Sequence, residues 1–223
     1  MPYYPVFLDL RGRKVLVVGG GEVAQRKVDT LLQFGAEVYI VSRELSSRLS
    51  DYEKTDRVKV LGPEFHEDHL EGSFLVIAAT DDPDLNHLIG EKAKEQGLLI
   101  NAVDQPVDCN FIVPSILSRG DLLIAVSTSG KSPALAKKIR KKLEKDFGSE
   151  YGLFLILMGH LREEILSRGL PLDENRRIFH ELVDSNILDS IGNKDWEEVS
   201  SIIDSILDME ISREDVMVLL KSE

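Results

Sequence analysis

Three consecutive glycines, Gly19 to Gly21, separate an apolar run from a segment with helical spacing, and this junction constrains the fold most. Residues 14–18 (KVLVV) are rich in β-branched side chains, which predicts a buried strand. Residues 22–34 carry apolar side chains at helical spacing with charged residues between them, and Gly35 follows as a C-terminal cap. The sequence therefore predicts a strand, a tight turn and a helix in immediate succession.

The same alternation continues as far as residue 103. Further strands are expected at residues 37–41, 57–61, 74–79 and 98–103, with a second helix at residues 84–96. The run at residues 74–79 (FLVIAA) is apolar throughout, as in parallel strands that are buried on both faces. Strands that alternate with helices predict an α/β fold with a doubly wound, Rossmann-like parallel sheet.

The pattern changes after this sheet. Residues 111–118 and 121–126 predict two strands joined by a hairpin at Arg119-Gly120, and Pro133 opens a predicted helix that runs to about residue 147. From residue 151 onward the pattern is helical, with breaks at residues 169–171 and 192–193. We therefore expect a nucleotide-binding domain (residues 1–112), a small α+β section (residues 113–148) and a helical C-terminal domain (residues 149–223).

Composition excludes several classes of protein. The 39 acidic and 27 basic side chains give a net charge of −12, which argues against a general nucleic-acid binder. No apolar run approaches the roughly 18 residues of a membrane span, and the first residues lack a signal-peptide pattern. We therefore expect a cytoplasmic protein with no membrane partner.

Metal binding is not expected either. The single cysteine, Cys109, excludes an intramolecular disulfide, and no Cys/His cluster has zinc spacing. His66 and His69 form an H-x-x-H pair with two acidic residues between them. That pair could hold a metal, but an acidic surface turn is the simpler interpretation.

Basic residues gather in one stretch of this acidic chain. Residues 131–145 contain seven lysines and arginines against one acid. Two interpretations stay open, a solvated helix face or a local attractor for an anionic ligand. The hydroxyl-rich loop from Ser127 to Ser132 precedes this stretch and, with Lys131, suits the binding of carboxylates or phosphates. A plain helix cap by Ser132 is the alternative.

The glycine turn carries the chemistry of a G-x-G-x-x-A motif. Gly19 permits the tight turn, Gly21 lets the backbone approach a pyrophosphate, and Ala24 lets the helix pack on the strand. A dinucleotide site is predicted, the alternative being a domain of this fold that has lost its ligand. After the second strand, Arg43 could stack on adenine or meet a phosphate, and Glu44 comes about one or two positions later than the acid that usually binds the ribose hydroxyls. The residues therefore do not decide between NADP and NAD.

Polar residues follow two further strands at the edge where ligands bind. Thr80 and Asp81 follow the fourth strand and Asp104 follows the fifth, so all three should line the cleft. Asp104 could act as a general base or orient a basic nitrogen of the substrate, or it could be a turn residue bonded to local amides. His87 lies early in the intervening helix, near the same cleft.

Five stretches together resemble the precorrin-2 dehydrogenase family, which includes the N-terminal module of bacterial sirohaem synthase. They are residues 4–10 (YPVFLDL), 17–27 (VVGGGEVAQRK), 78–82 (AATDD), 101–106 (NAVDQP), and 111–115 (FIVPS) continuing through 124–136 (IAVSTSGKSPALA). Their order and spacing are more specific than any one of them, and the resemblance covers roughly residues 3–145.

The resemblance implies NAD-dependent oxidation of precorrin-2 to sirohydrochlorin in sirohaem biosynthesis, a porphyrin pathway. The family's activity-linked aspartate aligns with Asp104, and its substrate-loop serine with Ser127. A histidine near the substrate in stand-alone relatives matches His87. NAD contacts carry over to Glu22, Val23, Arg43 and Glu44.

Relatives form homodimers through the middle section, so a homodimer is expected here as well. Precorrin-2 carries many carboxylates, which would explain the basic stretch. Two alternatives stay open. The first is a bifunctional enzyme that also inserts iron into sirohydrochlorin. The second is a non-catalytic, NAD-sensing regulatory domain, which would explain the glycine turn but not the loop at residues 127–136.

Overall fold

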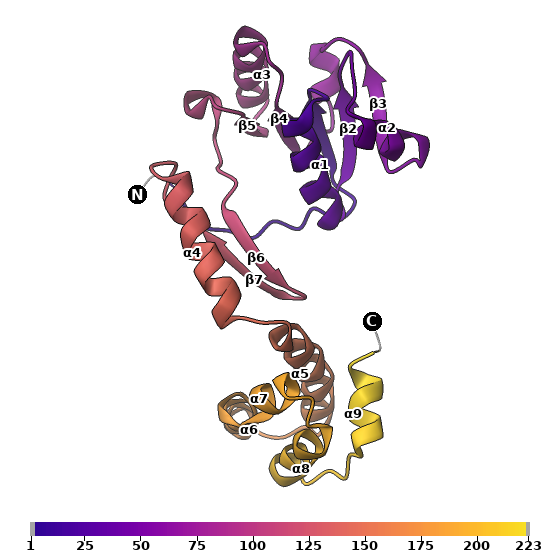
Figure 1. The fold of residues 1–223 in the computed structure, drawn as a ribbon, viewed down its shortest axis with the longest axis vertical. Coiled ribbons are helices and arrows are strands. Elements are labelled where there is room, and N and C mark those ends of the chain that lie inside the picture. Colours follow the sequence, from indigo (N-terminus) through magenta and orange to yellow (C-terminus); the bar gives the residue numbers. More distant parts are fainter. Residues whose placement is uncertain (1–2, 222–223) are drawn as a thin grey trace. The chain divides into compact units, whose positions relative to one another are not determined.

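A five-stranded parallel sheet in the order β3-β2-β1-β4-β5 organises the first half of the chain (Figure 1). Its strands are β1 (Lys14–Val18), β2 (Glu37–Val41), β3 (Val58–Gly62), β4 (Leu75–Ala78) and β5 (Leu99–Ala102). The computed structural model describes residues 3–221, and the predicted parallel sheet is confirmed. The strand order reverses at the boundary between β1 and β4, which is where ligands bind in sheets of this kind.

The period-two alternation of β1 explains why helices cover both faces. Val15 and Val17 pack in one buried cluster with Ala24 and Val28 of helix α1 (Glu22–Gln33). Leu16 and Val18 point to the opposite face and pack in a second cluster with Ile89 and Ala93 of α3 (Pro83–Glu95). Because adjacent strand residues face opposite sides, one apolar strand supports both layers.

Several short elements were not predicted. Helix α2 (Ser47–Lys54) buries only Leu49 and is capped by Ser46, whose Oγ accepts from the Leu49 N–H. The 3-10 helices η1 (Glu67–Leu70) and η2 (Pro106–Asp108) bury one residue each. Elements with so few buried side chains leave no periodic apolar pattern in the sequence, so periodicity does not predict them.

The chain divides between Val113 and Pro114 into two compact units. The second unit begins with the hairpin of β6 (Ser115–Arg119) and β7 (Leu122–Val126), followed by α4 (Pro133–Asp146). Arg119 pairs with Leu122, so the turn is Gly120-Asp121, one residue later than predicted, with Gly120 at φ +57°.

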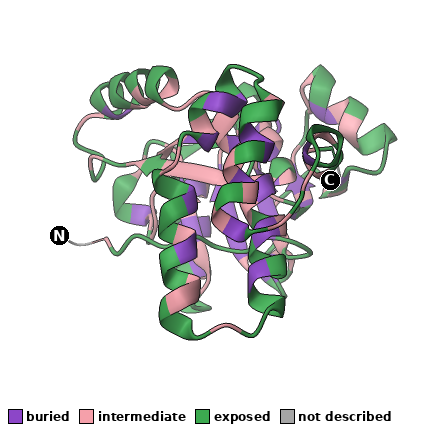
Figure 2. Ribbon diagram, turned by 90° about the horizontal axis from the view of Figure 1, so that it is seen from below, coloured by how far each residue is buried: buried purple, intermediate pink, exposed green. Residues whose placement is uncertain are grey.

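Five more helices complete the second unit and share one core. They are α5 (Glu150–Ser167), α6 (Leu172–Asp184), α7 (Ile187–Gly192), α8 (Trp196–Leu207) and α9 (Arg213–Leu219). The predicted helical character and the predicted breaks near Gly169 and Gly192 coincide with helix ends. Figure 2 shows the helices exposed on one side and buried on the other. The finer division at residues 113–148 and 149–223 stays a prediction.

None of the helices in residues 3–221 combines the length and the apolar character that crossing a membrane would require.

Candidate cofactor and substrate site

The turn after β1 is compressed between two neighbouring loops. The Gly19 N–H donates to the Val41 carbonyl over 2.9 Å, and a Cβ at Gly19, where φ is +123°, would overlap the carbonyl of Ala79. A Cβ at Gly20 would overlap the carbonyl of Glu44. Both positions therefore require glycine, because backbone from the β2 and β4 loops fills the space of a side chain. The need at Gly20, a variable position of the motif, was not predicted.

Gly21 has the opposite surroundings. It is exposed, and a Cβ built on it would meet no heavy atom within 4 Å. It is the N-cap of α1, yet no side chain caps the helix there. The first amides of α1, beginning at Glu22 and Val23, therefore face open space with their positive dipole end, and Ala24 is buried behind them. This arrangement fits a pyrophosphate and nothing in the turn obstructs it.

Arg43 and Glu44 follow β2 and are both exposed. The Arg43 guanidinium pairs with the carboxylate of Glu64, with 2.8 Å between Nη2 and Oε1. The Ser42 hydroxyl donates to the Glu44 carbonyl over 2.7 Å, so it turns back into its own loop. The positive charge of Arg43 is thus already balanced, and the Glu44 side chain makes no hydrogen bond to any described residue.

Thr80 and Asp81 follow β4, and a buried asparagine fixes the shape of their loop. Asn86 of α3 accepts from the Thr80 hydroxyl over 2.8 Å and from the Thr80 N–H over 3.1 Å. Its amide donates back to the Thr80 carbonyl over 3.0 Å. Asp81 is exposed, and Asp82 caps α3. Asn86 was not predicted, although a polar residue on the inner face of a helix was a usable signal.

Asp104 lies at the tip of the loop after β5. It is exposed, its φ is +60°, and its carboxylate accepts no hydrogen bond from residues 3–221. The alternative of a turn aspartate bonded to local amides therefore does not describe this carboxylate. The Cys109 thiol stabilises the loop by hydrogen bonding, since Sγ lies 3.2 Å from the Ala102 carbonyl oxygen and 3.4 Å from the Gln105 carbonyl oxygen. Burial raises the pKa of this thiol, which keeps it a donor.

Lys27 of α1 is a half-buried cation that was not among the predicted site residues. Burial is the main cause that lowers the pKa of its ammonium group, and Arg26 lowers it further. Attraction to Cys109 and Asp104 acts in the opposite direction. Lys27 and Asp104 therefore lie within electrostatic range of each other, although 77 positions separate them in the chain.

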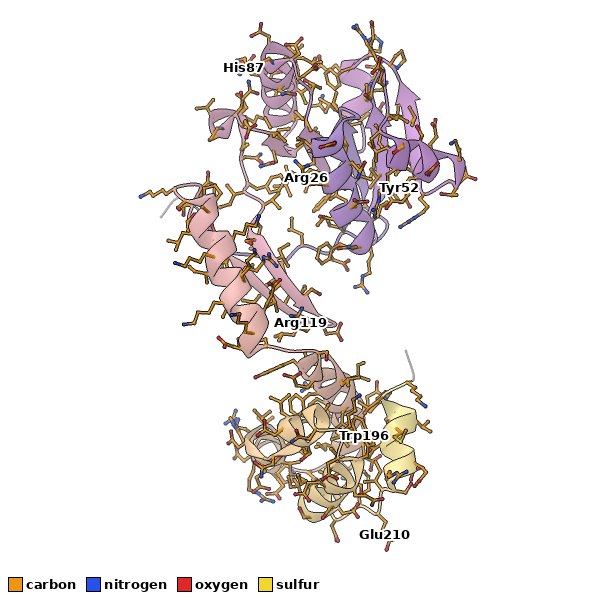
Figure 3. The ribbon with its side chains drawn as sticks, in the orientation of Figure 1. Arg26, Tyr52, His87, Arg119, Trp196 and Glu210 are labelled. Atoms are coloured by element: carbon orange, nitrogen blue, oxygen red, sulfur yellow. The ribbon has the colours of Figure 1, made fainter. Side chains whose placement is uncertain are left out.

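His87 lies on α3, where Figure 3 labels it, and is tied to a buried carboxylate. Its Nδ1 lies 2.8 Å from Oδ1 of Asp108, which is only 3% exposed. The Lys94 ammonium lies 3.9 Å from the same oxygen. Asp108 was not predicted as a site residue, because nothing local to η2 distinguishes it from a surface turn.

The predicted substrate loop belongs to the second unit. The Ser127 hydroxyl accepts from the Ser129 N–H over 3.0 Å, and the Thr128 hydroxyl accepts from the Ser132 N–H over 3.0 Å. Ser132 caps α4 by accepting from the Leu135 N–H over 3.3 Å, so that part of the simpler interpretation holds. Ser127 and Lys131 are exposed, and the described residues offer Lys131 no ion pair.

Helix α4 keeps most of its positive charge unpaired. Arg140 pairs with Glu144. The remaining lysines are exposed and have no ion pair within residues 3–221, namely Lys137, Lys138, Lys141, Lys142 and Lys145. No group of three or more His, Cys, Asp or Glu side chains in the described part of the chain could hold a metal ion. His66 and His69 instead contact each other, the His66 N–H donating to Nδ1 of His69 over 3.2 Å.

Two family models and several curated relatives match the sequence of this chain. The family model for NAD(P)-binding domains matches residues 6–115, and that for the central part of the sirohaem biosynthesis protein matches residues 119–146. The sirohaem synthase of Photorhabdus laumondii is 38% identical over 208 residues, which cover 93% of this chain and 44% of the relative. Sirohaem synthase 1 of Pectobacterium atrosepticum is 43% identical over 182 residues, covering 82% of this chain and 38% of the relative.

A solved structure extends this similarity. SirC, a precorrin-2 dehydrogenase, superposes with a TM-score of 0.77 at 28% identity and covers 93% of this chain and 100% of its own. This chain therefore spans less than half the length of the curated sirohaem synthases it matches, but the whole length of SirC.

Proposed function

This chain belongs to the family of precorrin-2 dehydrogenases and of the N-terminal module of sirohaem synthase, and we propose that it oxidises precorrin-2 to sirohydrochlorin with NAD. One observation carries the proposal. The unbonded carboxylate of Asp104 and the open N-terminus of α1 at Gly21 both follow carboxyl ends of parallel strands, so they occupy the same edge of the sheet.

The residues of the β1 and β2 ends support NAD as the cofactor. When bound, NAD accepts a hydride at its nicotinamide ring. Gly19, Gly21 and the amides of Glu22 and Val23 would hold the pyrophosphate, and Thr80 and Asp81 would line the nicotinamide side of the cleft. Glu44 would accept hydrogen bonds from the ribose hydroxyls, whereas the charge of Arg43 is already balanced by Glu64. That pairing favours NAD over NADP.

We assign substrate binding to the hydroxyl and ammonium groups of the loop before α4 and of α4 itself. Ser127 and Lys131 would bind substrate carboxylates, and the unpaired lysines of α4 would raise the local concentration of an anionic macrocycle. Asp104 would orient a pyrrole nitrogen or accept its proton, and His87 would lie beside the same substrate. Most of the rate enhancement then comes from positioning, because the hydride donor and acceptor must meet in one geometry.

The proposal includes a cytoplasmic homodimer. Leu135 and Ile139 lie four residues apart on α4, so they share one face of the helix, and both are exposed. An apolar stripe on an otherwise basic helix suits burial against a second copy.

The test is the absorbance of purified protein incubated anaerobically with precorrin-2 and NAD. Wild type should form sirohydrochlorin and NADH, and Asp104→Ala should lose at least about a hundredfold in rate if the carboxylate transfers a proton. Asp56→Ala is the matched control, since Asp56 is also exposed and also has a positive φ, but precedes β3 at the opposite edge of the sheet.

Each other outcome favours a different function. If Asp104→Ala converts precorrin-2 as fast as wild type and Asp56→Ala do, the dehydrogenase activity is upheld but Asp104 has no part in the mechanism. A wild type that binds NADH but converts no precorrin-2 would contradict the dehydrogenase and favour the NAD-sensing domain. Consumption of sirohydrochlorin when ferrous iron is added would show the bifunctional enzyme.

A further inference from the structure

Lys27 of α1 is a half-buried cation whose charge has no partner in the described part of the chain. Its ammonium group makes no hydrogen bond and no ion pair with residues 3–221. Lys14 and Lys92 are half-buried as well, but Lys14 donates to the His69 carbonyl over 3.1 Å. Lys92 donates to the Glu95 carboxylate over 3.0 Å. Because a charge removed from water is costly without such replacements, the bare ammonium of Lys27 calls for an explanation.

The phase of α1 places Lys27 on the flank of the helix that faces β4 and β5. On the sheet side of α1 a stripe of three apolar residues is buried, namely Ala24, Val28 and Leu31. On one flank of this stripe, Gln25 accepts a hydrogen bond from the Ser46 hydroxyl, which follows β2, over 2.7 Å. One turn further on the same flank, Asp29 accepts from the Tyr52 hydroxyl of α2 over 2.7 Å. At roughly 100° of rotation per residue, Lys27 lies on the other flank, and β4 lies on the other side of β1 from β2.

The segment after β5 reaches this flank of α1. Phe111 packs against the buried cluster that α1 shares with the sheet. Burial is the main cause that lowers the pKa of the Lys27 ammonium, and attraction to Cys109 and Asp104 opposes it, so both lie within Coulombic range. A helical side chain leans toward the N-terminus of its own helix. The ammonium of Lys27 therefore lies toward the carboxyl edge of the sheet, the edge that carries Asp104.

Lys27 and Asp104 present two complementary groups at one edge without neutralising each other. No ion pair joins the ammonium to the carboxylate, and neither group has a hydrogen bond to residues 3–221. One group binds anions and the other accepts hydrogen bonds from N–H groups. A ligand that carries a carboxylate on its rim and N–H groups inside its ring offers a partner to each.

We propose that Lys27 is a substrate-binding residue, which takes one carboxylate of precorrin-2 while Asp104 takes a pyrrole N–H group. This rests on the proposed function. Contact at two points fixes the rotation of the macrocycle in its own plane, so that one carbon–hydrogen bond faces the nicotinamide. The pyrophosphate of NAD is assigned to the first amides of α1 at Glu22 and Val23, so the cofactor leaves Lys27 for the substrate. A charge-assisted bond in a half-buried site is also stronger than one in open water.

The experiment measures the Kd of sirohydrochlorin by absorbance titration and the KM of precorrin-2 with saturating NAD under anaerobic conditions. Oxidation leaves the rim carboxylates in place, so the product reports substrate binding without turnover. Lys27→Met keeps a long unbranched side chain and removes the charge. It should raise both constants by about tenfold to a hundredfold, the effect of losing one hydrogen bond to a charged group. The Kd of NADH should stay within about twofold of wild type.

Two further variants isolate the contribution of the charge at this position. Arg26→Gln is the matched control, since Arg26 is the neighbouring cation on α1 (Figure 3) but is exposed. It should change the Kd of sirohydrochlorin by less than about twofold, because an exposed charge is screened by water and salt. Lys27→Arg should bind sirohydrochlorin more tightly than Lys27→Met, since the guanidinium keeps the charge and its donors.

Thermal unfolding distinguishes a binding lysine from a structural one. A lysine that stabilised the fold would lower Tm when replaced. We expect the Tm of Lys27→Met to equal or exceed that of wild type, because the variant no longer buries an unpaired charge.

Three results would overturn the proposal while wild-type turnover still upholds the dehydrogenase. The first is an unchanged Kd of sirohydrochlorin in Lys27→Met. The second is weaker binding of NADH alone, which would assign Lys27 to the cofactor. The third is a lowered Tm with weaker binding of both ligands, which would show a structural lysine. A wild type that converts no precorrin-2 would instead end the proposed function itself, and this proposal with it.

Discussion

The three glycines of the first turn occupy three different environments. Gly19 and Gly20 are surrounded by backbone from neighbouring loops, whereas Gly21 faces open space. In the sequence they look alike, and the motif assigns roles only to Gly19 and Gly21. The structure therefore separates a requirement of folding, at Gly20, from a proposed requirement of binding, at Gly21.

This separation yields a paired prediction. Gly20→Ala should lose about 1–3 kcal/mol of stability, since the new methyl group overlaps the Glu44 carbonyl. At about 2–4 °C per kcal/mol, the loss is measurable as a lowered Tm. Gly21→Ala should leave Tm unchanged, because φ there is −79° and the Cβ meets nothing, but weaken NADH binding by about tenfold.

Thermal unfolding and fluorescence titration of NADH check both variants. Equal NADH affinity in wild type and Gly21→Ala would remove this glycine from the cofactor site. An unchanged Tm in Gly20→Ala would show that the loop after β2 shifts to accommodate the added methyl group without a loss of stability.

At the scale of elements, the hydrogen bonds along the open lateral side of β5 show why one predicted boundary was wrong. A strand was expected from residue 111, but β6 begins at Ser115. Instead, the side chain of the preceding Asn110 forms hydrogen bonds with backbone groups along the open side of β5. Asn110 accepts from the Ile100 N–H over 2.8 Å and donates to the Leu98 carbonyl over 2.7 Å. An edge strand needs such partners, and the apolar character of residues 111–113 does not reveal them.

The ends of β2 and β3 carry a prediction about cofactor choice. Glu64, which follows β3, holds Arg43, which follows β2. Glu64→Gln should free the guanidinium to meet a 2′-phosphate and raise the kcat/KM of NADP relative to NAD by about fivefold, the effect of roughly 1 kcal/mol. The pair is exposed, so a larger effect is not expected.

Steady-state kinetics with each cofactor measures that ratio. Glu67→Gln is the control, because Glu67 is also exposed but contacts Lys92 rather than Arg43. The same ratio in Glu64→Gln and wild type would mean that Arg43 does not take part in cofactor choice.

At the scale of the whole molecule, each unit has its own buried clusters. Two clusters lie in the first unit, one on each face of the sheet, and a third lies among the helices of the second. The one tryptophan of the chain, Trp196, packs against that third cluster. Its fluorescence therefore reports the second unit alone, while circular dichroism reports both.

NAD should stabilise the first unit selectively. At about one hundred times its Kd, a ligand adds about 2.7 kcal/mol to the unit that binds it. We expect the transition seen by circular dichroism to move upward with NAD, while the Trp196 transition moves less. Parallel shifts by both probes would show that the two units unfold together.

Local pattern alone was enough for much of this protein. The alternation of strands and helices, the glycine turn and the position of Asp104 after β5 follow from residues within a few positions of one another. Backbone periodicity is a short-range property, so these features were predicted from the sequence. The short α2, η1 and η2 were not, because each buries too little to leave a pattern.

Only the tertiary structure decided which distant residues meet. Arg43 and Glu64 are 21 positions apart, and so are His87 and Asp108. Lys27 lies within Coulombic range of Asp104, 77 positions later in the chain, and Gly20 packs against the carbonyl of Glu44, 24 positions later. Such contacts depend on the strand order β3-β2-β1-β4-β5, which places these loops at one edge. Strand order is settled by packing of the whole sheet, and no short window of sequence contains it.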